Sequence, residues 1–579
     1  MNSSMTLVSK TGSQARLTGS LFNLLSMSVR PVMLLVLWFC AGGMACGAES
    51  RPVRFANPIC EQADPWVTQD DGRYLACFAE GNRAISIQIS YRLTELGPKQ
   101  IVWTAPATGP ASREVWAPEL HHIEGHWYVY FAASDGQNKN HKAWVLQSQG
   151  NDPLGPYSLH GPLYTGDNPD LRSANRWAID LTVFELNGHR YAIWSGWPDE
   201  RDVQYLYIAP MKDPLTIGAA RVRLCANDDF IWERVSERLG ERGLNEAPEV
   251  LQHRGRTFVA YSCSGSWQPS YKLGMLELRP GGNPINPADW TKFPEPVFKS
   301  SARTYGVGHG SFVKSPDGAQ DWLVYHAKRD REDGWRRYVI AQPFHWDAGG
   351  LPMFGEPVAA GQLLPVPSGE KHPEVTGPHS FQFTTPADLA GWSYYGHHQM
   401  MSLHDGALHL GEVPAVVANG YRSGEKVVLN GGNWSDLTAT AQMRALEPKG
   451  EMGLLFRVQY PAVGENAQHG YYAGIKLGES RVVLGCTDGS EWRELASAPV
   501  SVPVNSTAEL TVSAHGDRIQ ASVNGKLVLQ ATDSRFASGS VGLRVVGAHA
   551  AFTRLKIAPA TEGGSGASPA SSTVRRRPT

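Results

Sequence analysis

Five segments of the chain repeat one pattern, in which a turn residue and a glycine lead into an apolar run rich in aromatic residues. They read DGRYLACF (71–78), EGHWYVYF (124–131), NGHRYAIW (187–194), RGRTFVAY (254–261) and DGAQDWLVY (317–325). The glycines of successive segments stand 53 to 67 residues apart. A glycine turn between two apolar runs is typical of a β-hairpin, so the pattern predicts five hairpins at similar spacing.

A further strand-like run follows each hairpin, and almost nothing between residues 52 and 357 has the period of an amphipathic helix. The runs read AISIQIS, KAWVLQS, QYLYIAP, YKLGMLEL and YVIAQPFHW. Five repeats of three or four strands predict a five-bladed β-propeller. A pair of β-sandwiches would not repeat the hairpin so regularly, and a β-helix has much shorter repeats. The predicted fold class is therefore all-β.

A second β-region follows a stretch rich in proline and glycine between residues 365 and 378. Its runs alternate apolar and polar residues, and Asn524-Gly525 separates two of them, which is a strong hairpin signal. Many alternating strands over this length predict a β-sandwich of the jelly-roll type. We therefore expect a propeller over 52–362, a linker over 363–378, a sandwich accessory domain over 379–560 and a disordered tail over 561–579.

The first 48 residues have the order of a secretory signal, with Arg30, an apolar run over 31–45 and small residues after it. The run is too short and too rich in glycine for a membrane span. Met27 as the true start would give a leader of ordinary length, with cleavage between Ala45 and Ala48. The residues before Cys46 resemble a lipoprotein signal only weakly, so we expect export to the periplasm or the medium without a lipid anchor.

Charge and composition narrow the possible functions. The net charge of −2 and the 19% of charged residues give no basic patch, so we expect no nucleic-acid partner. Eighteen tryptophans suit a β-protein or a sugar binder, although tryptophan also fills cores. Five cysteines follow the leader, among which Cys60 and Cys77 could pair in an oxidising compartment, and no cysteine or histidine spacing indicates a zinc site.

The first strand of each propeller blade lines the central channel, so residues at the start of these strands converge at one channel mouth. Counting back from the repeat glycines gives these positions as Asp64, Pro118 with Glu119, Asp180, Glu246 and His309. Carboxylates at one mouth repel each other unless they share a proton, a cation or a polyol. Two carboxyl groups about 6.5–9.5 Å apart, one protonated and one ionised, are what inverting glycoside hydrolysis requires.

At these residues the sequence resembles glycoside hydrolase family 43, an inverting family built on a five-bladed propeller. The resemblance covers about residues 57–357 and includes WAPELHHIEGHWYVYFAA, NEAPEVL, YSCSGSW and GHGSFVKSPDG. It implies that Asp64 is the general base, Glu246 the general acid and Asp180 the residue that orients the acid and modulates its pKa.

The resemblance also implies roles around the reacting groups. Trp116, Trp267 and His309 match substrate-binding positions, and His309 matches an axial histidine near a bound cation, usually calcium, that it would hold through water. No organic cofactor is implied. Two departures touch the pocket wall: Gly310 follows the histidine where asparagine is expected, and Ala247 follows the acid where glycine is usual.

Within the family the chain is most similar to secreted exo-acting α-L-arabinofuranosidases, which implies release of terminal L-arabinofuranose from arabinan- or arabinoxylan-type plant polysaccharide. A β-xylosidase or a β-galactofuranosidase shares the same three acids and differs only in the pocket walls. A non-catalytic propeller that binds carbohydrate is an alternative from another class, and retention of all three acids disfavours it. The C-terminal sandwich resembles the concanavalin-like or laminin-G-like modules of carbohydrate enzymes.

Overall fold

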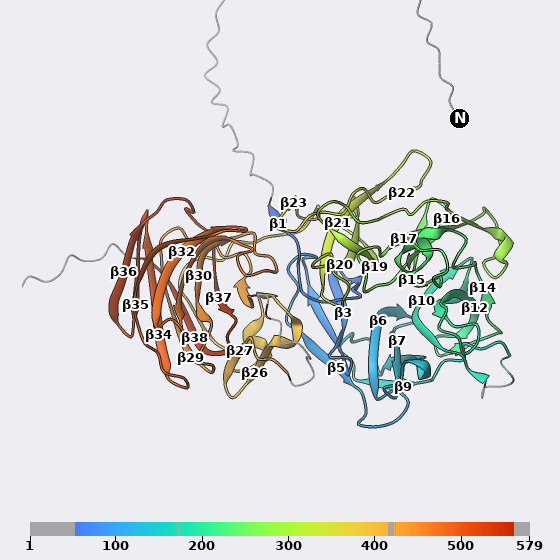
Figure 1. Cartoon of the computed structure of the whole chain (residues 1–579), viewed down its shortest axis with the longest axis horizontal. Helices are drawn as coiled ribbons and strands as arrows, with labels where there is room; N and C mark the ends of the chain where they lie inside the picture. The colour runs from blue at the N-terminus through green and yellow to red at the C-terminus, as the bar shows by residue number, and fades with distance from the viewer. Residues whose placement is uncertain (1–52, 169, 171–173, 415–421, 423, 561–579) are drawn as a thin grey trace, which may run out of the picture. The chain divides into compact units, whose positions relative to one another are not determined.

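The computed structural model describes residues 53–560 except 169, 171–173, 415–421 and 423. Its first part is a ring of five antiparallel sheets, coloured blue to yellow-green in Figure 1. Within each sheet every strand pairs with the next along the chain, except that β14 (Val222–Arg223) pairs with β12 (Tyr205–Asp213). The five hairpins predicted from the glycine repeats all form, and each glycine of the repeat has a positive φ, between 71° and 81°. The five-bladed propeller is therefore confirmed.

Each blade contains four or five strands. The first blade comprises β2 (Trp66–Asp70), β3 (Arg73–Glu80), β4 (Ala84–Ser90) and β5 (Gln100–Thr104). The second comprises β6 (Arg113–Ile123), β7 (His126–Ser134), β8 (Lys142–Ser148) and β9 (Tyr157–His160). The third comprises β10 (Ala178–Leu186), β11 (His189–Gly196), β12 (Tyr205–Asp213), β13 (Thr216–Ile217) and β14 (Val222–Arg223). The fourth comprises β15 (Asn245–His253), β16 (Arg256–Cys263), β17 (Lys272–Leu278) and β18 (Trp290–Lys292). The fifth comprises β19 (Tyr305–Lys314), β20 (Asp321–Lys328), β21 (Arg337–Trp346) and β22 (Pro352–Met353).

Apolar side chains between neighbouring blades hold the ring together. Separate clusters of buried residues join blades one and two, two and three, three and four, and four and five. A fifth cluster contains Val67 and Tyr74 of the first blade with Trp322 and Val324 of the fifth, so apolar packing also closes the ring. Burial of apolar area is the main favourable contribution to folding, and here it is distributed around the whole ring.

Backbone pairing at the two ends of the propeller reinforces this closure. β1 (Arg54–Ala56) pairs antiparallel with β23 (Leu363–Pro365), which lies in the segment predicted to be a linker. The amide of Ile59 donates to the carbonyl of Val339 on β21, and the amide of Val339 donates to the carbonyl of Cys60, each over 2.9 Å. The segment that enters the first blade is thus hydrogen-bonded to the last blade.

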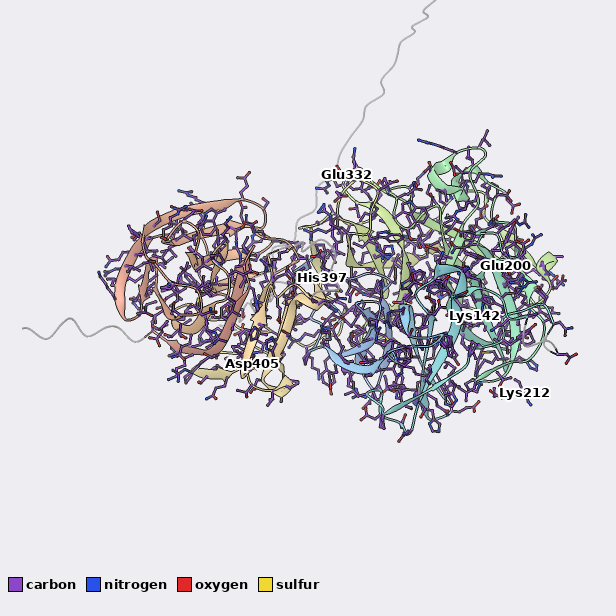
Figure 2. All side chains as sticks on the ribbon, turned by 60° about the horizontal axis from the view of Figure 1, so that its bottom comes forward. Lys142, Glu200, Lys212, Glu332, His397 and Asp405 are labelled. Carbon is purple, nitrogen blue, oxygen red and sulfur yellow. The ribbon has the colours of Figure 1, made fainter. Side chains whose placement is uncertain are left out.

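The second part of the chain, coloured orange to red in Figure 1, is a sandwich of two antiparallel sheets. One sheet contains β24 (His379–Gln382), β26 (Met401–His404), β27 (Ala407–Leu410), β29 (Leu437–Ala445), β34 (Thr507–His515), β35 (Arg518–Val523), β36 (Lys526–Thr532) and β38 (Ala550–Pro559). The other contains β25 (Trp392–Tyr395), β28 (Lys426–Leu429), β30 (Glu451–Gln459), β31 (His469–Lys476), β32 (Arg481–Asp488), β33 (Trp492–Pro499) and β37 (Ser540–Val546). One large apolar core lies between them, and β29 alternates buried and half-buried residues along its length. The predicted sandwich is confirmed, and side chains fill both parts of the chain (Figure 2).

The suggestion that Cys60 and Cys77 pair is wrong. Both thiols are free and buried. Cys60 packs in the cluster between blades five and one, whereas Cys77 packs in the cluster between blades one and two. The two side chains therefore belong to different interblade cores, and burial raises the pKa of each thiol.

The predicted leader over 1–48 and the predicted tail over 561–579 lie outside the described residues. Helix is sparse in the described chain and consists of short 3-10 turns such as η5 (Pro287–Asp289). None of the helices in residues 53–560 that the structure describes has the length and apolar character needed to cross a bilayer.

Candidate active site

In each blade a residue in the left-handed region of backbone space lies in or shortly before the innermost strand, eight or nine residues before the hairpin glycine. These residues are Asp64 (φ 51°), Ala117 (44°), Asp180 (52°), Ala247 (47°) and His309 (43°). Each of the first four precedes its hairpin glycine by eight residues, and His309 precedes its own by nine. In blades two to five the pairing with the second strand shifts register at this point, as in a β-bulge. The left-handed residue thus recurs in all five blades, and a bulge accompanies it in four of them.

The irregularity explains how side chains are aimed into the mouth. A bulge bends its strand and turns a side chain away from the sheet, and a left-handed conformation costs about 1–2 kcal/mol for a residue that carries a Cβ atom. Such strain at equivalent positions is a pointer to function. The left-handed positions also correct the list of channel-mouth residues obtained by counting back from the repeat glycines. In blades two and four the equivalent residues are Ala117 and Ala247. Glu246 lies one residue before its equivalent position, and Glu119 lies two residues after.

Asp64 is surrounded by nitrogen atoms. Its Oδ1 lies 3.0 Å from Nη1 of Arg337, 3.0 Å from Nδ1 of His326 and 3.4 Å from Nδ1 of His309. Burial opposes ionisation of this carboxyl, but the Arg337 charge and the two histidines outweigh burial and hold the pKa of Asp64 below its ordinary value. Asp64 is therefore ionised.

The surroundings of Glu246 favour the protonated carboxyl, in contrast to those of Asp64. Its side chain is 7% exposed, the Tyr271 hydroxyl donates to Oε1 over 2.8 Å, and Nε2 of Gln204 donates to Oε2 over 2.9 Å. Burial raises the pKa of Glu246, the two hydrogen bonds oppose this rise, and the negative charge of Asp64 adds to it. Two carboxyl groups of one site are thus driven toward opposite protonation states.

Asp180 is tied to the backbone beside Glu246. Its Oδ2 accepts a hydrogen bond of 3.0 Å from the amide of Ala247, and its side chain is 3% exposed. Burial raises the pKa of Asp180, and the charges of Glu246 and Asp64 raise it further. Because electrostatic coupling is mutual, Asp180 also disfavours ionisation of Glu246.

A second pair of acids lies further along the innermost strands of blades two and four. Glu119 and Glu249 follow the left-handed residues of blades two and four by two positions, and both are buried. Their carboxyl groups are hydrogen-bonded to each other, which requires a proton between them. Burial raises the pKa of both groups and the charge of Asp180 adds to the rise, so the pair carries less than two negative charges.

His309, which the sequence predicts near the channel axis, lies beside Asp64, with its Nδ1 3.4 Å from Oδ1 of that carboxyl. Its amide donates to the Ser262 hydroxyl over 2.8 Å, and burial lowers the pKa of its imidazole, which is therefore neutral. Calcium prefers six to eight oxygen ligands, and His309 offers one nitrogen. Among the described residues, three or more histidine, cysteine or acidic ligand atoms gather within 4.8 Å only in the sandwich. Side chains at His309 thus form no calcium cage, and a water-mediated ion there stays a prediction.

Trp116 lies among aromatic rings beside the left-handed residues of blades two and three. It is half-buried, and its indole stacks on His141 with ring centroids 3.9 Å apart. Trp177 and Trp197 stack at 4.6 Å in the same cluster, which also contains Ile179, the residue before Asp180. The structure therefore places Trp116 in an aromatic wall next to this part of the mouth.

Trp267 contacts a second tryptophan, Trp335, which in turn lies beside Arg337. Its ring lies 5.8 Å from that of Trp335, and its carbonyl accepts from the amide of Gly334 over 2.7 Å. Trp335 is 64% exposed, and the Arg337 guanidinium lies 5.4 Å from its ring centroid. An exposed indole is thus held beside the arginine that contacts Asp64.

Sequence reasoning missed five residues that surround Asp64 and Glu246. They are Gln204, Tyr271, His326, Trp335 and Arg337. None belongs to a first strand, to which the search was restricted. His326 could have been found from the predicted hairpin of the fifth blade. It pairs with Gly308 on the neighbouring strand, and Gly308 is adjacent to the predicted His309.

Comparison with known proteins agrees with this geometry. The family model "Glycosyl hydrolases family 43" matches residues 55–352, which is just over half of the chain and contains all the site residues described above. The model "3-keto-alpha-glucoside-1,2-lyase-like domain" matches residues 385–558, within the sandwich.

Three curated relatives are similar to the propeller half. Alpha-L-arabinofuranosidase 43 of Humicola insolens is 33% identical over 55% of this chain and 66% of its own length. Extracellular exo-alpha-(1->5)-L-arabinofuranosidase of Streptomyces avermitilis is 35% identical over 56% of this chain and 67% of its own length. The protein of the same name from Streptomyces chartreusis is 34% identical over 49% of this chain and 86% of its own length. The chain thus spans about two thirds of the first two relatives.

Proposed function

The chain belongs to glycosyl hydrolases family 43 and is a glycosidase, and we propose that it inverts configuration while releasing terminal L-arabinofuranose from arabinan- or arabinoxylan-type polysaccharide. The names of its relatives support the sugar, and two of those names specify exo action on α-(1→5) linkages. The same names include the word extracellular, which supports export of this chain.

The observation that carries the proposal is that the surroundings of Asp64 lower its pKa whereas those of Glu246 raise its pKa. Asp64 is held ionised by Arg337 and two histidines, while burial and the Asp64 charge favour a protonated Glu246. Environments that push two pKa values apart in one site are the pattern of an acid and a base with separate roles. A carbohydrate-binding propeller without catalysis needs no such difference.

The proposed reaction uses these two groups in one displacement. Asp64 removes a proton from a water molecule whose oxygen attacks the anomeric carbon of the terminal sugar. Glu246 gives its proton to the glycosidic oxygen as the bond from that oxygen to the anomeric carbon breaks. The carbon is attacked on the face opposite the leaving group, so the released sugar has inverted configuration. Glu246 ends ionised and Asp64 protonated, and exchange with solvent restores both.

Asp180 keeps the acid ready for this step. Its hydrogen bond from the Ala247 amide fixes the backbone directly after Glu246, and its coupling to Glu246 disfavours ionisation of the acid. Both effects favour a protonated Glu246 in a fixed place before the substrate binds. We assign the half-buried Trp116 and the Trp267–Trp335 pair to the sugar-contacting walls, because indole faces cover the apolar faces of sugar rings.

The test is product analysis with matched substrates. Linear α-1,5-arabino-oligosaccharides should release arabinose alone, one residue at a time, with shorter oligomers appearing in sequence. The nitrophenyl glycosides of α-L-arabinofuranose, β-xylose and β-galactofuranose should rank in that order by kcat/KM. A preference for the xyloside or the galactofuranoside would replace the proposed sugar, and no turnover of any substrate would support the carbohydrate-binding alternative.

A further inference from the structure

Three histidines of the sandwich come from β26, from β27 and from the residue directly before β38, three adjacent antiparallel strands. Ser402 on β26 pairs with His409 on β27, so His404, two residues along β26, lies on the same face as His409. His409 pairs in turn with Ala551 on β38, and His549 lies two residues before Ala551. The pairing register thus brings three imidazoles together from segments 140 residues apart in the chain.

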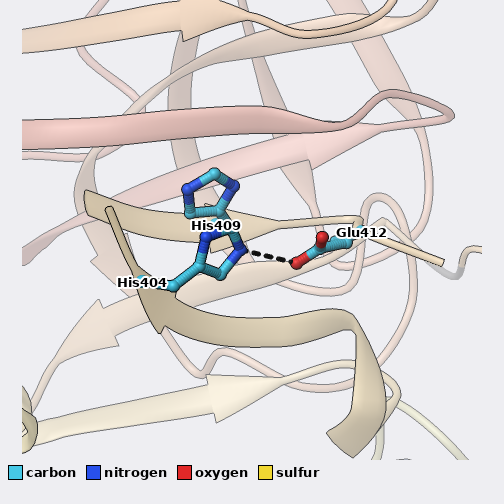
Figure 3. A group of neighbouring side chains, drawn as sticks. All are labelled: His404, His409 and Glu412. Carbon is cyan, nitrogen blue, oxygen red and sulfur yellow. Dashed lines mark hydrogen bonds and ion pairs between the residues drawn. The ribbon is translucent and has the colours of Figure 1, made fainter. Parts of the chain in front are cut away.

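These histidines gather around one carboxylate, as Figure 3 shows for two of them. His404, His409 and Glu412 each offer a ligand atom, and these atoms all lie within 4.8 Å of one another. The imidazole rings of His404 and His409 stack with centroids 3.6 Å apart. Nε2 of His404 lies 3.0 Å from Oε2 of Glu412, the contact drawn as a dashed line. This spacing is compatible with shared coordination of one ion by the three residues.

The orienting contacts of the two histidines use their Nδ1 atoms, so an ion would bind Nε2 of each, of which that of His404 now contacts Glu412. Nδ1 of His404 lies 3.2 Å from Oδ2 of Asp405, and Nδ1 of His409 lies 2.9 Å from Nε2 of His549. Metal-binding histidines commonly use one nitrogen for such an orienting hydrogen bond and the other for the metal. The Ser402 hydroxyl donates to Oε2 of Glu412 over 2.8 Å, which orients the carboxylate in the same way.

A second observation points to a ligand at this place. His409 is only 2% exposed, and its Nε2 has no hydrogen-bond partner among the described residues. A buried polar nitrogen without a partner is costly, and most buried polar groups in folded proteins have one. His404 and Glu412 are 40% and 37% exposed at the side chain, so an ion from solvent can reach the cluster.

We propose that His404, His409 and Glu412 bind a divalent transition-metal ion, with Zn²⁺ as the best match, and that His549 and Asp405 orient the two histidines. Two imidazoles and one carboxylate suit zinc, whereas calcium and magnesium prefer oxygen ligands alone. Three protein ligands leave a fourth position for water. The ion would join the β26–β27 hairpin to the segment that follows it.

The experiment uses the full-length mature protein without a polyhistidine tag, stripped with a chelator and dialysed. Calorimetric titration with Zn²⁺ should show one ion per chain, and Co²⁺ should give the visible absorption of a tetrahedral site. The variants His404→Ala and Glu412→Gln should each weaken Zn²⁺ binding by about 10-fold or more. Both residues are partly exposed, so each variant should fold, which circular dichroism checks.

His515→Ala is the matched control, because His515 is an exposed histidine of the same sheet whose Nδ1 lies 2.8 Å from Oδ2 of Asp436. It should bind Zn²⁺ as the parent protein does, and Ca²⁺ should bind to none of these proteins. Zn²⁺ affinity that is equal in the parent and in both cluster variants would overturn the proposal, as would equal losses in His515→Ala. Glycosidase activity is not a readout here, so failure of the zinc site and failure of the proposed function are separate results.

Discussion

Arg337 offers the sharpest test of how the base is kept ionised. Its Nη1 lies 3.0 Å from Oδ1 of Asp64, and Arg337→Met removes the charge while keeping much of the side-chain length. The neighbouring cation lowers the pKa of Asp64, so its removal should raise that pKa. The acid limb of kcat/KM reports ionisation of the base in the free enzyme, and it should move to higher pH.

The size of the shift follows from the distance. Two unit charges about 4 Å apart near a protein surface interact by about 4 kcal/mol, and an adjacent arginine lowers an aspartate pKa by about 1–3 units. The limb should therefore rise by about 1–3 pH units, which costs the variant about 5- to 10-fold in kcat/KM at a pH one unit below the new limb. His309 and His326 remain in place, so Asp64 keeps part of its stabilisation.

The assay is a pH profile of kcat/KM on an arabinofuranoside for the parent enzyme, Arg337→Met and Arg337→Lys. The lysine variant keeps the charge and should return the limb toward that of the parent. Arg336→Met is the control, because Arg336 is the adjacent residue, about half exposed, and pairs with Asp330. An acid limb in Arg337→Met at the same pH as in the parent would refute the reasoning.

Three further predictions concern the acid and its strand. Glu246→Gln should lower kcat by about 10²–10⁴-fold while product binding by calorimetry stays within a few-fold, and equal activity would end its assignment as the acid. Tyr271→Phe removes a hydrogen-bond donor that lowers the pKa of Glu246. The pKa of Glu246 should therefore rise and move the alkaline limb of the pH profile up by about 0.5–1 unit, and a downward shift would contradict this. Ala247→Gly relieves a left-handed alanine at φ 47° and should raise the Tm of the propeller by about 1–3 °C in calorimetry, whereas a lower Tm would show that the alanine methyl contributes more than its strain costs.

The sequence predicted the fold because its signals are local. Each hairpin is encoded by one glycine with positive φ next to an apolar run, so five glycines define five blades. The strand after each hairpin was also visible as an apolar run, and β4 and β8 have the predicted bounds of AISIQIS and KAWVLQS. Alternation along β29 predicted a sheet with one buried face, which the sandwich confirms.

The site was predicted only in part, because its strands are not regular. Counting back from the glycine found Asp64 and Asp180 at eight residues and His309 at nine, but Glu246 lies one residue before the equivalent position, which Ala247 occupies in the bulge. Arg337, Tyr271 and Gln204 come from outer strands and loops, where side chains meet Asp64 or Glu246 only after the ring closes. Such contacts have no period along the chain, so a search based on periodicity does not find them.

The measurement that tests the central claim most directly is proton NMR during hydrolysis of linear α-1,5-arabino-oligosaccharides by the mature enzyme. An ionised Asp64 that activates water and a protonated Glu246 that serves the leaving group together require inversion. The first arabinose to appear should therefore be the β-anomer, with the α-anomer growing in only as the free sugar equilibrates. Initial release of the α-anomer would contradict the assignment of Asp64 and Glu246 as a single-displacement base and acid.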